Sequence, residues 1–227
     1  IIWFNNVAKK IFFESRFASN ENIHNAKQFV DSLTADGGTE MLPALKLALD
    51  SKSESEFLQQ IVFITDGNVS NERDLFAFIN ANLGDKRLFT VGIGSAPNSF
   101  FMKRSAKAGR GTFTFISNTR EVGNKTEALF RKLETPALTD ISLAVFGDDV
   151  ETYHQPIPDL YIGEPVTVLL RGKNLLNTIT LKGNIGKNSW QHKVLLNTGS
   201  DNSGVRIAWA REKIAALTQA HYDESAG

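Results

Sequence analysis

The sequence predicts an α/β fold: a doubly wound, mostly parallel sheet followed by an antiparallel β-rich extension and a C-terminal helix. Between residues 60 and 133, short apolar runs alternate with segments of helical periodicity. The runs are continuous, as in residues 61–65, which is typical of strands buried on both faces. Strict alternation of such strands with helices indicates a parallel sheet that helices cover on both faces.

The pattern changes after Pro136, where β-branched runs are separated by Gly, Pro, Asn and Asp. Such segments are typical of an antiparallel β unit and not of further α/β layers. We therefore expect three parts: an α/β domain over residues 1–136, a β-rich, sandwich-like extension over 137–203, and a C-terminal helix with a tail over 204–227.

The individual elements follow from apolar periodicity, helix caps and chain breakers. Residues 9–17 are expected to form the second strand, because an Ile-Phe-Phe run lies at its centre. Ser19 or Asn20 can cap the first helix, and Pro43 suits the first turn of the second. The first domain should thus have strands at residues 1–4, 9–17, 61–65, 87–93 and 111–116, and helices around 20–33, 42–49, 71–83, 99–108 and 124–133.

The later part should have strands at residues 138–146, 164–171, 178–183 and 190–196. Residues 205–219 then have helical periodicity. We expect this helix to have one apolar face, with residues 211–213 away from it. The residues of the apolar face are Ile207, Ala210, Ile214 and Leu217.

Composition excludes several classes of function. Lys plus Arg and Asp plus Glu both number 25, so no net field recruits nucleic acid or anionic lipid. The chain has no cysteine, which excludes disulfides, thiolate nucleophiles and Cys-ligated zinc. No apolar run approaches the roughly 20 residues of a membrane span. No Gly-x-Ser-x-Gly or Walker motif is present, which removes common hydrolase and nucleotidase interpretations.

Two loops carry the candidate site. Gly37-Gly38-Thr39 precedes a helix, and the buried strand at residues 61–65 runs into Asp66-Gly67. Ligands bind at the carboxyl ends of strands in open α/β sheets, so Asp66 is expected at such an edge. A hydroxyl and a carboxylate are hard oxygen donors, suited to Mg²⁺. From the residues alone a metal site and a structural role stay open, since Thr39 could cap a helix and Asp66 a turn.

Together these loops resemble two of the three elements of the metal-ion-dependent adhesion site of von Willebrand factor A (VWA) domains, which are Rossmann-like. The resemblance implies that Thr39 and Asp66 are metal ligands. Within this family, the sequence is most similar to the inter-alpha-trypsin inhibitor heavy chains and their bacterial surface relatives with VIT and VWA domains. This similarity is found in residues 65–72, 87–94 and 209–214.

One family element has no counterpart here. The Asp-x-Ser-x-Ser motif on the first, central strand of the family is absent, and Ile1 aligns with the start of the second strand. We therefore expect an excised fragment that lacks the N-terminal first strand and binds Mg²⁺ (or Mn²⁺ or Ca²⁺) weakly or not at all, while the longer protein binds it. The absent strand would lie between the strands at 1–4 and 61–65. We expect its loss to be compensated, either by direct pairing of those two strands or by another chain or segment in the open position.

The resemblance implies a non-enzymatic adhesion module of a bacterial cell envelope or extracellular protein. Its partner would be a protein that presents an Asp or Glu carboxylate to the metal. The alternatives are a metal-assisted hydrolase, in which Asp66 is a general base or metal ligand, and a purely structural scaffold. An exposed, shallow oxygen cluster at Asp66 would favour adhesion, and a deep pocket with a second acid or base would favour an enzyme.

Overall fold

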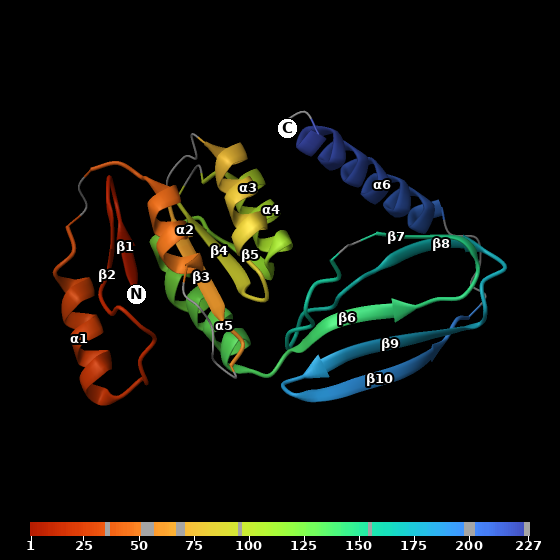
Figure 1. The fold of residues 1–227 in the computed structure, drawn as a ribbon, viewed down its shortest axis with the longest axis horizontal. Coiled ribbons are helices and arrows are strands. Elements are labelled where there is room, and N and C mark those ends of the chain that lie inside the picture. The colour runs from red at the N-terminus through yellow and green to blue at the C-terminus, as the bar shows by residue number, and fades with distance from the viewer. Residues whose placement is uncertain are drawn as a thin grey trace. The chain divides into compact units, whose positions relative to one another are not determined.

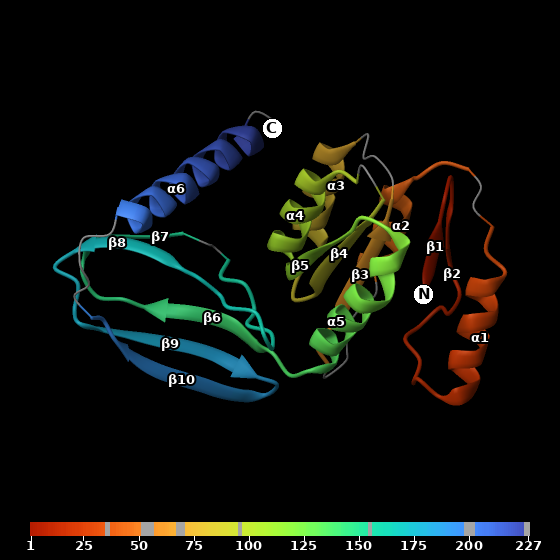
Figure 2. The same cartoon turned by 180° about the vertical axis from the view of Figure 1, so that it is seen from behind.

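The structure is a computed structural model of the chain. It describes residues 1–34, 37–50, 57–66, 71–94, 97–153, 156–197 and 203–224, with side chains up to residue 218 in the last range. The chain divides into two compact units, Ile1–Val122 and Gly123–Gly227, which we describe separately (Figures 1 and 2).

The first unit is a mixed α/β unit built around a parallel sheet. Its three sheet strands follow the order β3-β4-β5, and all pairs in it are parallel. This confirms the predicted class of fold. In chain order the elements are β1 (Ile2–Phe4), β2 (Ala8–Lys10), α1 (Asn20–Asp31), α2 (Met41–Leu49), β3 (Gln60–Thr65), α3 (Glu72–Asn82), β4 (Arg87–Ile93), α4 (Ser99–Ala108), β5 (Arg110–Ile116) and the short 3-10 helix η1 (Thr119–Glu121).

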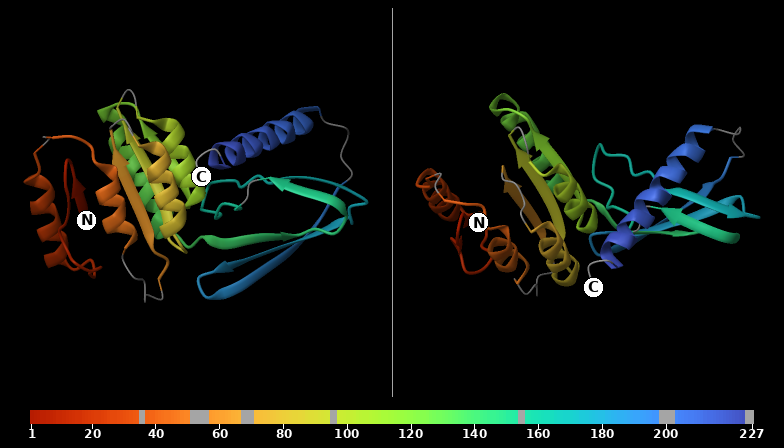
Figure 3. Two further views of the ribbon diagram at one scale, coloured as in Figure 1. Left: turned by 45° about the horizontal axis from the view of Figure 1, so that its top comes forward. Right: turned by 90° about the horizontal axis from the view of Figure 1, so that it is seen from above.

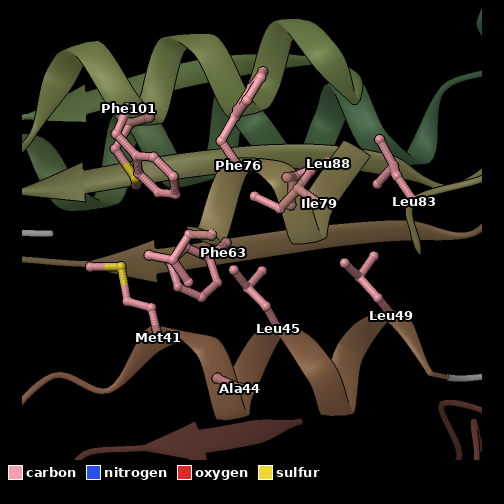
Figure 4. Packing of buried hydrophobic residues seen from close by; sticks show 12 residues of the cluster. Met41, Ala44, Leu45, Leu49, Phe63, Phe76, Ile79, Leu83, Leu88 and Phe101 are labelled. Atoms are coloured by element: carbon pink, nitrogen blue, oxygen red, sulfur yellow. The ribbon is translucent and has the colours of Figure 1, made fainter. Parts of the chain in front are cut away.

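Apolar side chains of α2, α3 and α4 pack on β3 and β4 to form the core of this unit (Figure 4). The helical periodicity predicted for α3 is confirmed: Leu75, Phe76, Ile79 and Leu83 are all buried. Strand β4 is buried over nearly its whole length, as a central parallel strand should be. Burial of such side chains stabilises the fold by roughly 1.5–3 kcal/mol each.

The first two strands form a separate antiparallel hairpin, with Phe4 opposite Ala8. The prediction of a strand over residues 9–17 is wrong, because β2 ends at Lys10. Phe13 and Phe17 are 96% and 90% exposed, so the apolar run that suggested the strand has no core to enter. The ring of Phe4, in β1 of the hairpin, stacks on the ring of Phe63 in β3, with 5.4 Å between the ring centroids. The hairpin is thus attached to the core by side chains.

The second unit contains two antiparallel sheets. One has the order β10-β9-β6, and the other is the pair β7-β8 (Figure 2). Strand β7 was not predicted; Asp148 and Asp149 open this strand, and Asp149 has a positive φ of 52°. The elements are α5 (Val122–Glu134), which begins at the boundary between the units, β6 (Leu138–Ala144), β7 (Asp148–Tyr153), β8 (Leu169–Lys173), β9 (Thr178–Ile185), β10 (Asn188–Leu195) and α6 (Ser203–Glu224).

Helix α6 lies over β7 and β8 (Figures 1 and 3). The Trp209 ring meets the edge of Tyr153 at 5.5 Å between centroids, and Lys213 binds Glu151 at 3.0 Å. The apolar face predicted for this helix is thus not the side that contacts the strands. Trp209 and Lys213 face the strands, whereas Ile214 is 63% exposed. An aromatic ring and an ion pair outcompete the aliphatic face at this contact because β7 and β8 themselves present Tyr153, Glu151 and Arg171.

Candidate functional site

The loop before α2 is held against the turn of the β1–β2 hairpin. The backbone N–H of Gly38 donates to Asn6 Oδ1 at 2.7 Å, and the N–H of Glu40 donates to the carbonyl of Asn5 at 2.7 Å. Both glycines are required by this contact. Gly37 has φ +83°, and a Cβ on Gly38 would lie 2.6 Å from Asn6 Oδ1. The adjacent glycines therefore let the loop that carries Thr39 approach the hairpin closely.

Thr39 does not cap α2. The N-cap position is Glu40, whose side chain makes no capping hydrogen bond. The Thr39 side chain is exposed, and within the described part of the chain its hydroxyl has no hydrogen-bond partner. The structural interpretation of Thr39 as a helix cap is therefore wrong. Its hydroxyl is available to a ligand.

Asp66 follows β3 directly and is exposed, whereas Thr65 and Phe63, in the strand, are buried. Among the described residues no hydrogen bond or ion pair reaches the Asp66 carboxylate. Gly67, the other half of the predicted motif, lies outside the described residues. The strand thus delivers an exposed carboxylate at its carboxyl end.

The two loops lie at the same end of the first unit. Helix α2 runs against β3, with Met41 in its first turn near Phe63 and Leu49 at the opposite end of the strand (Figure 4). Because Thr39 precedes this first turn and Asp66 follows β3, the topology places both residues at the carboxyl edge of the parallel sheet. That edge is where ligands bind in open α/β sheets.

Two hard oxygen donors are chemically suited to Mg²⁺, Mn²⁺ or Ca²⁺, but they are few. Mg²⁺ takes six oxygen ligands in near-octahedral geometry. In the described ranges no group of three or more His, Cys, Asp or Glu side chains could hold a metal ion. Thr39 and Asp66 therefore fit such a cation in kind, while the rest of its coordination has to come from water or other donors.

Four further glycines of the first unit have structural roles. A Cβ on Gly92 would lie 2.9 Å from Pro97 Cβ, and Gly94 has φ +95°, so this pair serves a close approach and a turn. Gly109 closes α4, and a Cβ on Gly111 would lie 2.2 Å from the Leu88 carbonyl oxygen.

Asn5 and Asn6 are the residues of this site that sequence reasoning missed. Asn5 Oδ1 accepts from the Val7 N–H at 3.0 Å, which shapes the turn, and Asn6 then holds Gly38. The pairing spans 32 positions, so no local pattern predicts it.

Comparison with known proteins agrees with the fold. Residues 1–115 match the sequence profile described as "von Willebrand factor type A domain". The chain belongs to the von Willebrand factor type A domain family. Domains of this family are mostly non-enzymatic protein-interaction modules, and they commonly bind a divalent metal ion.

Several relatives carry the same domain within much longer chains. A von Willebrand factor A domain-containing protein of Dictyostelium discoideum is 29% identical over 144 residues, which are 63% of this chain and 16% of that protein. Von Willebrand factor A domain-containing protein 5B1 of Mus musculus is 27% identical over 168 residues, 72% of this chain and 14% of its own. The chain thus spans less than a fifth of the length of these relatives.

Two solved structures share the fold. A von Willebrand factor type A protein from Catenulispora acidiphila has a TM-score of 0.59 at 16% identity, covering 88% of this chain and 57% of that one. The ArnB paralog VWA2 from Sulfolobus acidocaldarius has a TM-score of 0.50 at 16% identity, covering 86% and 53%. In the described ranges, no helix combines the length and apolar character needed to cross a bilayer.

Proposed function

We propose that this chain is a non-enzymatic adhesion module whose contact is bridged by a cation. Thr39 Oγ1 and an Asp66 carboxylate oxygen are the protein ligands, and Mg²⁺, Mn²⁺ or Ca²⁺ is the cation. A bound divalent ion would attract the Asp or Glu carboxylate of a protein partner. The observation that carries the proposal is the exposure of both oxygens at one edge of the parallel sheet, where neither has a hydrogen-bond partner among the described residues.

The exposure of Asp66 supports adhesion over the hydrolase alternative. A general base is usually held beside a second acid or base in a closed site, where its environment tunes proton transfer. The Asp66 side chain is instead solvent-exposed at the end of β3. An exposed carboxylate suits capture of a hydrated cation and of a large partner. We also propose that the chain belongs with the inter-alpha-trypsin inhibitor and bacterial surface subgroup, and that it is located in the cell envelope or outside the cell.

The edge of β3 away from β4, where the described residues form no strand pairing, is a second place for a protein contact. Within the described residues β3 pairs with a strand on its β4 side, and the β1–β2 hairpin forms its own sheet. Unpaired strand edges offer a row of backbone donors and acceptors to an added strand. We propose that an extended segment, from this protein or from another chain, pairs there.

Thermal unfolding with and without divalent cations tests the metal ligands. With a dissociation constant of about 1 mM, 10 mM Mg²⁺ should stabilise the chain by about 1.4 kcal/mol. The variants Asp66→Asn and Thr39→Val should lose this stabilisation, because each removes one oxygen ligand with little change of shape. Asp31→Asn and Thr34→Val are matched controls at exposed positions and should keep it.

Two results would contradict the assignment. Equal stabilisation of wild type, Asp66→Asn and Thr39→Val would show that the cation binds elsewhere. Micromolar affinity for Mg²⁺ would show that this chain supplies more ligands than the two proposed.

A further inference from the structure

Strand β10 is the outer strand of its sheet. The sheet has the order β10-β9-β6, so among the described strands β10 pairs only with β9 (Figure 2). This pairing runs without a register shift over the whole of Asn188–Leu195. The side chains of β10 are exposed, except that Trp190 is partly buried. The other side of β10 is therefore a long, regular sheet edge that no described strand covers.

Alternate residues of β10 direct their backbone groups to this free edge. In an antiparallel pair, residues that exchange hydrogen bonds with the partner strand alternate with residues whose N–H and C=O point away from it. The N–H of Leu196, directly after β10, donates to the carbonyl of Asn177, directly before β9, at 2.8 Å. The even-numbered residues of β10 therefore face β9. The backbone groups of Ser189, Gln191 and Lys193 point to the free edge.

The two edges of this sheet differ in their protection. Natural edge strands are protected by bulges, proline, charged residues or a covering segment. Strand β6, at the opposite edge, has a register shift between Thr139 and Ser142, and its Leu138 forms an isolated bridge with Leu160. Strand β10 has no bulge and no proline, and Lys193 is its only Lys, Arg, Asp or Glu. Of the two edges, that of β10 is the one open to another strand.

A second copy of β10 is complementary to this edge. When two copies pair antiparallel about a twofold axis at Gln191, each Trp190 lies opposite His192 of the second copy. Ser189 then lies opposite Lys193, so no two like charges face each other, whereas an axis at Lys193 would place two lysines together. Trp190 and His192 already stack on one face of the strand, with 5.9 Å between ring centroids. The axis at Gln191 extends this row of rings across the interface.

We propose that β10 pairs antiparallel with β10 of a second copy, about a twofold axis at Gln191. The edge groups of Ser189, Gln191 and Lys193 are then hydrogen-bonded across the interface, and two three-stranded sheets join into one. The assembly closes at a dimer, because the β6 edge of each sheet is protected. This pairing does not involve the cation site at Thr39 and Asp66, so either assignment can fail alone.

Analytical ultracentrifugation of the full chain tests this pairing. The edge is short, so we expect a weak dimer, with monomer and dimer both present at about 0.1 mM protein. Gln191→Pro removes an N–H of the free edge, which an edge strand tolerates, and should raise the dissociation constant of the dimer at least about tenfold. Gln191→Ala is the matched control, because it keeps that N–H and should dimerise within about threefold of wild type. Circular dichroism should show similar unfolding midpoints for the two variants.

A charge swap at the same position tests the twofold axis. Gln191→Lys places two ammonium groups opposite each other in the dimer and should weaken it at least about tenfold. An equimolar mixture of Gln191→Lys and Gln191→Glu pairs an ammonium with a carboxylate instead. The mixture should therefore dimerise more strongly than Gln191→Lys alone.

Four results would overturn the proposal. A chain that stays monomeric at about 1 mM would rule out a second copy and leave the edge to a strand of another protein. A dimer that Gln191→Pro does not weaken would be formed by another surface. Equal loss of the dimer in Gln191→Pro and Gln191→Ala would mean that the side chain, and not the backbone edge, makes the contact. A Gln191→Lys dimer as strong as that of wild type would mean that the axis does not lie at this residue.

Discussion

The contact that positions Thr39 can be broken from either side. Asn6→Ala removes the oxygen that accepts the Gly38 N–H, and Gly38→Ala places a Cβ 2.6 Å from where that oxygen lies. The Asn6 side chain is short and exposed, so it should rotate away from the new methyl group. Both substitutions then abolish the same 2.7 Å hydrogen bond.

The magnitudes follow from that shared bond. A hydrogen bond of this kind contributes about 1 kcal/mol to the free energy of unfolding, so Asn6→Ala should cost about that much. Gly38→Ala should cost somewhat less, because alanine lowers the entropy of the unfolded chain by the equivalent of about 0.4–1 kcal/mol. In the double variant the bond can be lost only once. The coupling free energy should therefore be about 1 kcal/mol, and the effect of alanine on the unfolded chain cancels within the cycle.

Urea unfolding of the four proteins, followed by tryptophan fluorescence and circular dichroism, measures this cycle. If the effects of the two substitutions simply add, the Gly38–Asn6 contact does not hold the loop. The same set of proteins should show weaker Mg²⁺ stabilisation in each single variant, because Thr39 is then less well positioned.

Three further predictions concern the core, a glycine and the α6 contact. Phe63 is 6% exposed and its ring stacks on Phe4, so Phe63→Ala should lower the free energy of unfolding in urea by about 3–5 kcal/mol. Phe13 is 96% exposed, so Phe13→Ala should change the free energy of unfolding by less than about 0.5 kcal/mol. Similar effects of the two substitutions would contradict the assigned core. Gly111→Ala should lower the free energy of unfolding by more than about 1 kcal/mol, because its Cβ would lie 2.2 Å from the Leu88 carbonyl oxygen. Gly123→Ala should be neutral or stabilising, because a Cβ there meets open space. The hydrogen bond from Lys213 lowers the pKa of the Glu151 carboxyl from its ordinary value, so Lys213→Met should raise that pKa in an NMR titration. The effect of Lys213→Met on stability should shrink as the pH falls through the folded pKa. An unchanged titration would mean that the ion pair is absent in solution.

Sequence reasoning succeeded where burial is dictated by a local period. The apolar residues of β4 form a continuous run, and those of α3 form one stripe. Each pattern can be buried in an α/β layer in only one way, and the bounds of both elements were predicted to within a residue or two. Ser19 was correctly expected to cap α1, since its Oγ accepts from the Asn22 N–H at 3.2 Å. These signals lie within one element and depend on no distant partner.

Sequence reasoning failed where the outcome depends on a distant partner. The apolar residues 11–17 look like a strand, but β2 ends at Lys10 and Phe13 stays in solvent. The periodicity of α6 indicated which residues share a face, but it could not show that β7 and β8 would select Trp209 and Lys213 over that face. For the same reason the support of Thr39 by Asn6 was not foreseen, whereas the exposed edge position of Asp66 follows from strand direction alone.

Paramagnetic broadening by Mn²⁺ tests the central claim most directly, because it reports which amides lie near the bound cation. If Thr39 and Asp66 share one cation, the amide signals of residues 38–40 and 65–66 should broaden together as Mn²⁺ is added. Asp66→Asn and Thr39→Val should each remove the broadening from both segments. Broadening of one segment without the other, or first at another carboxylate cluster such as Asp148 and Asp149, would contradict the account.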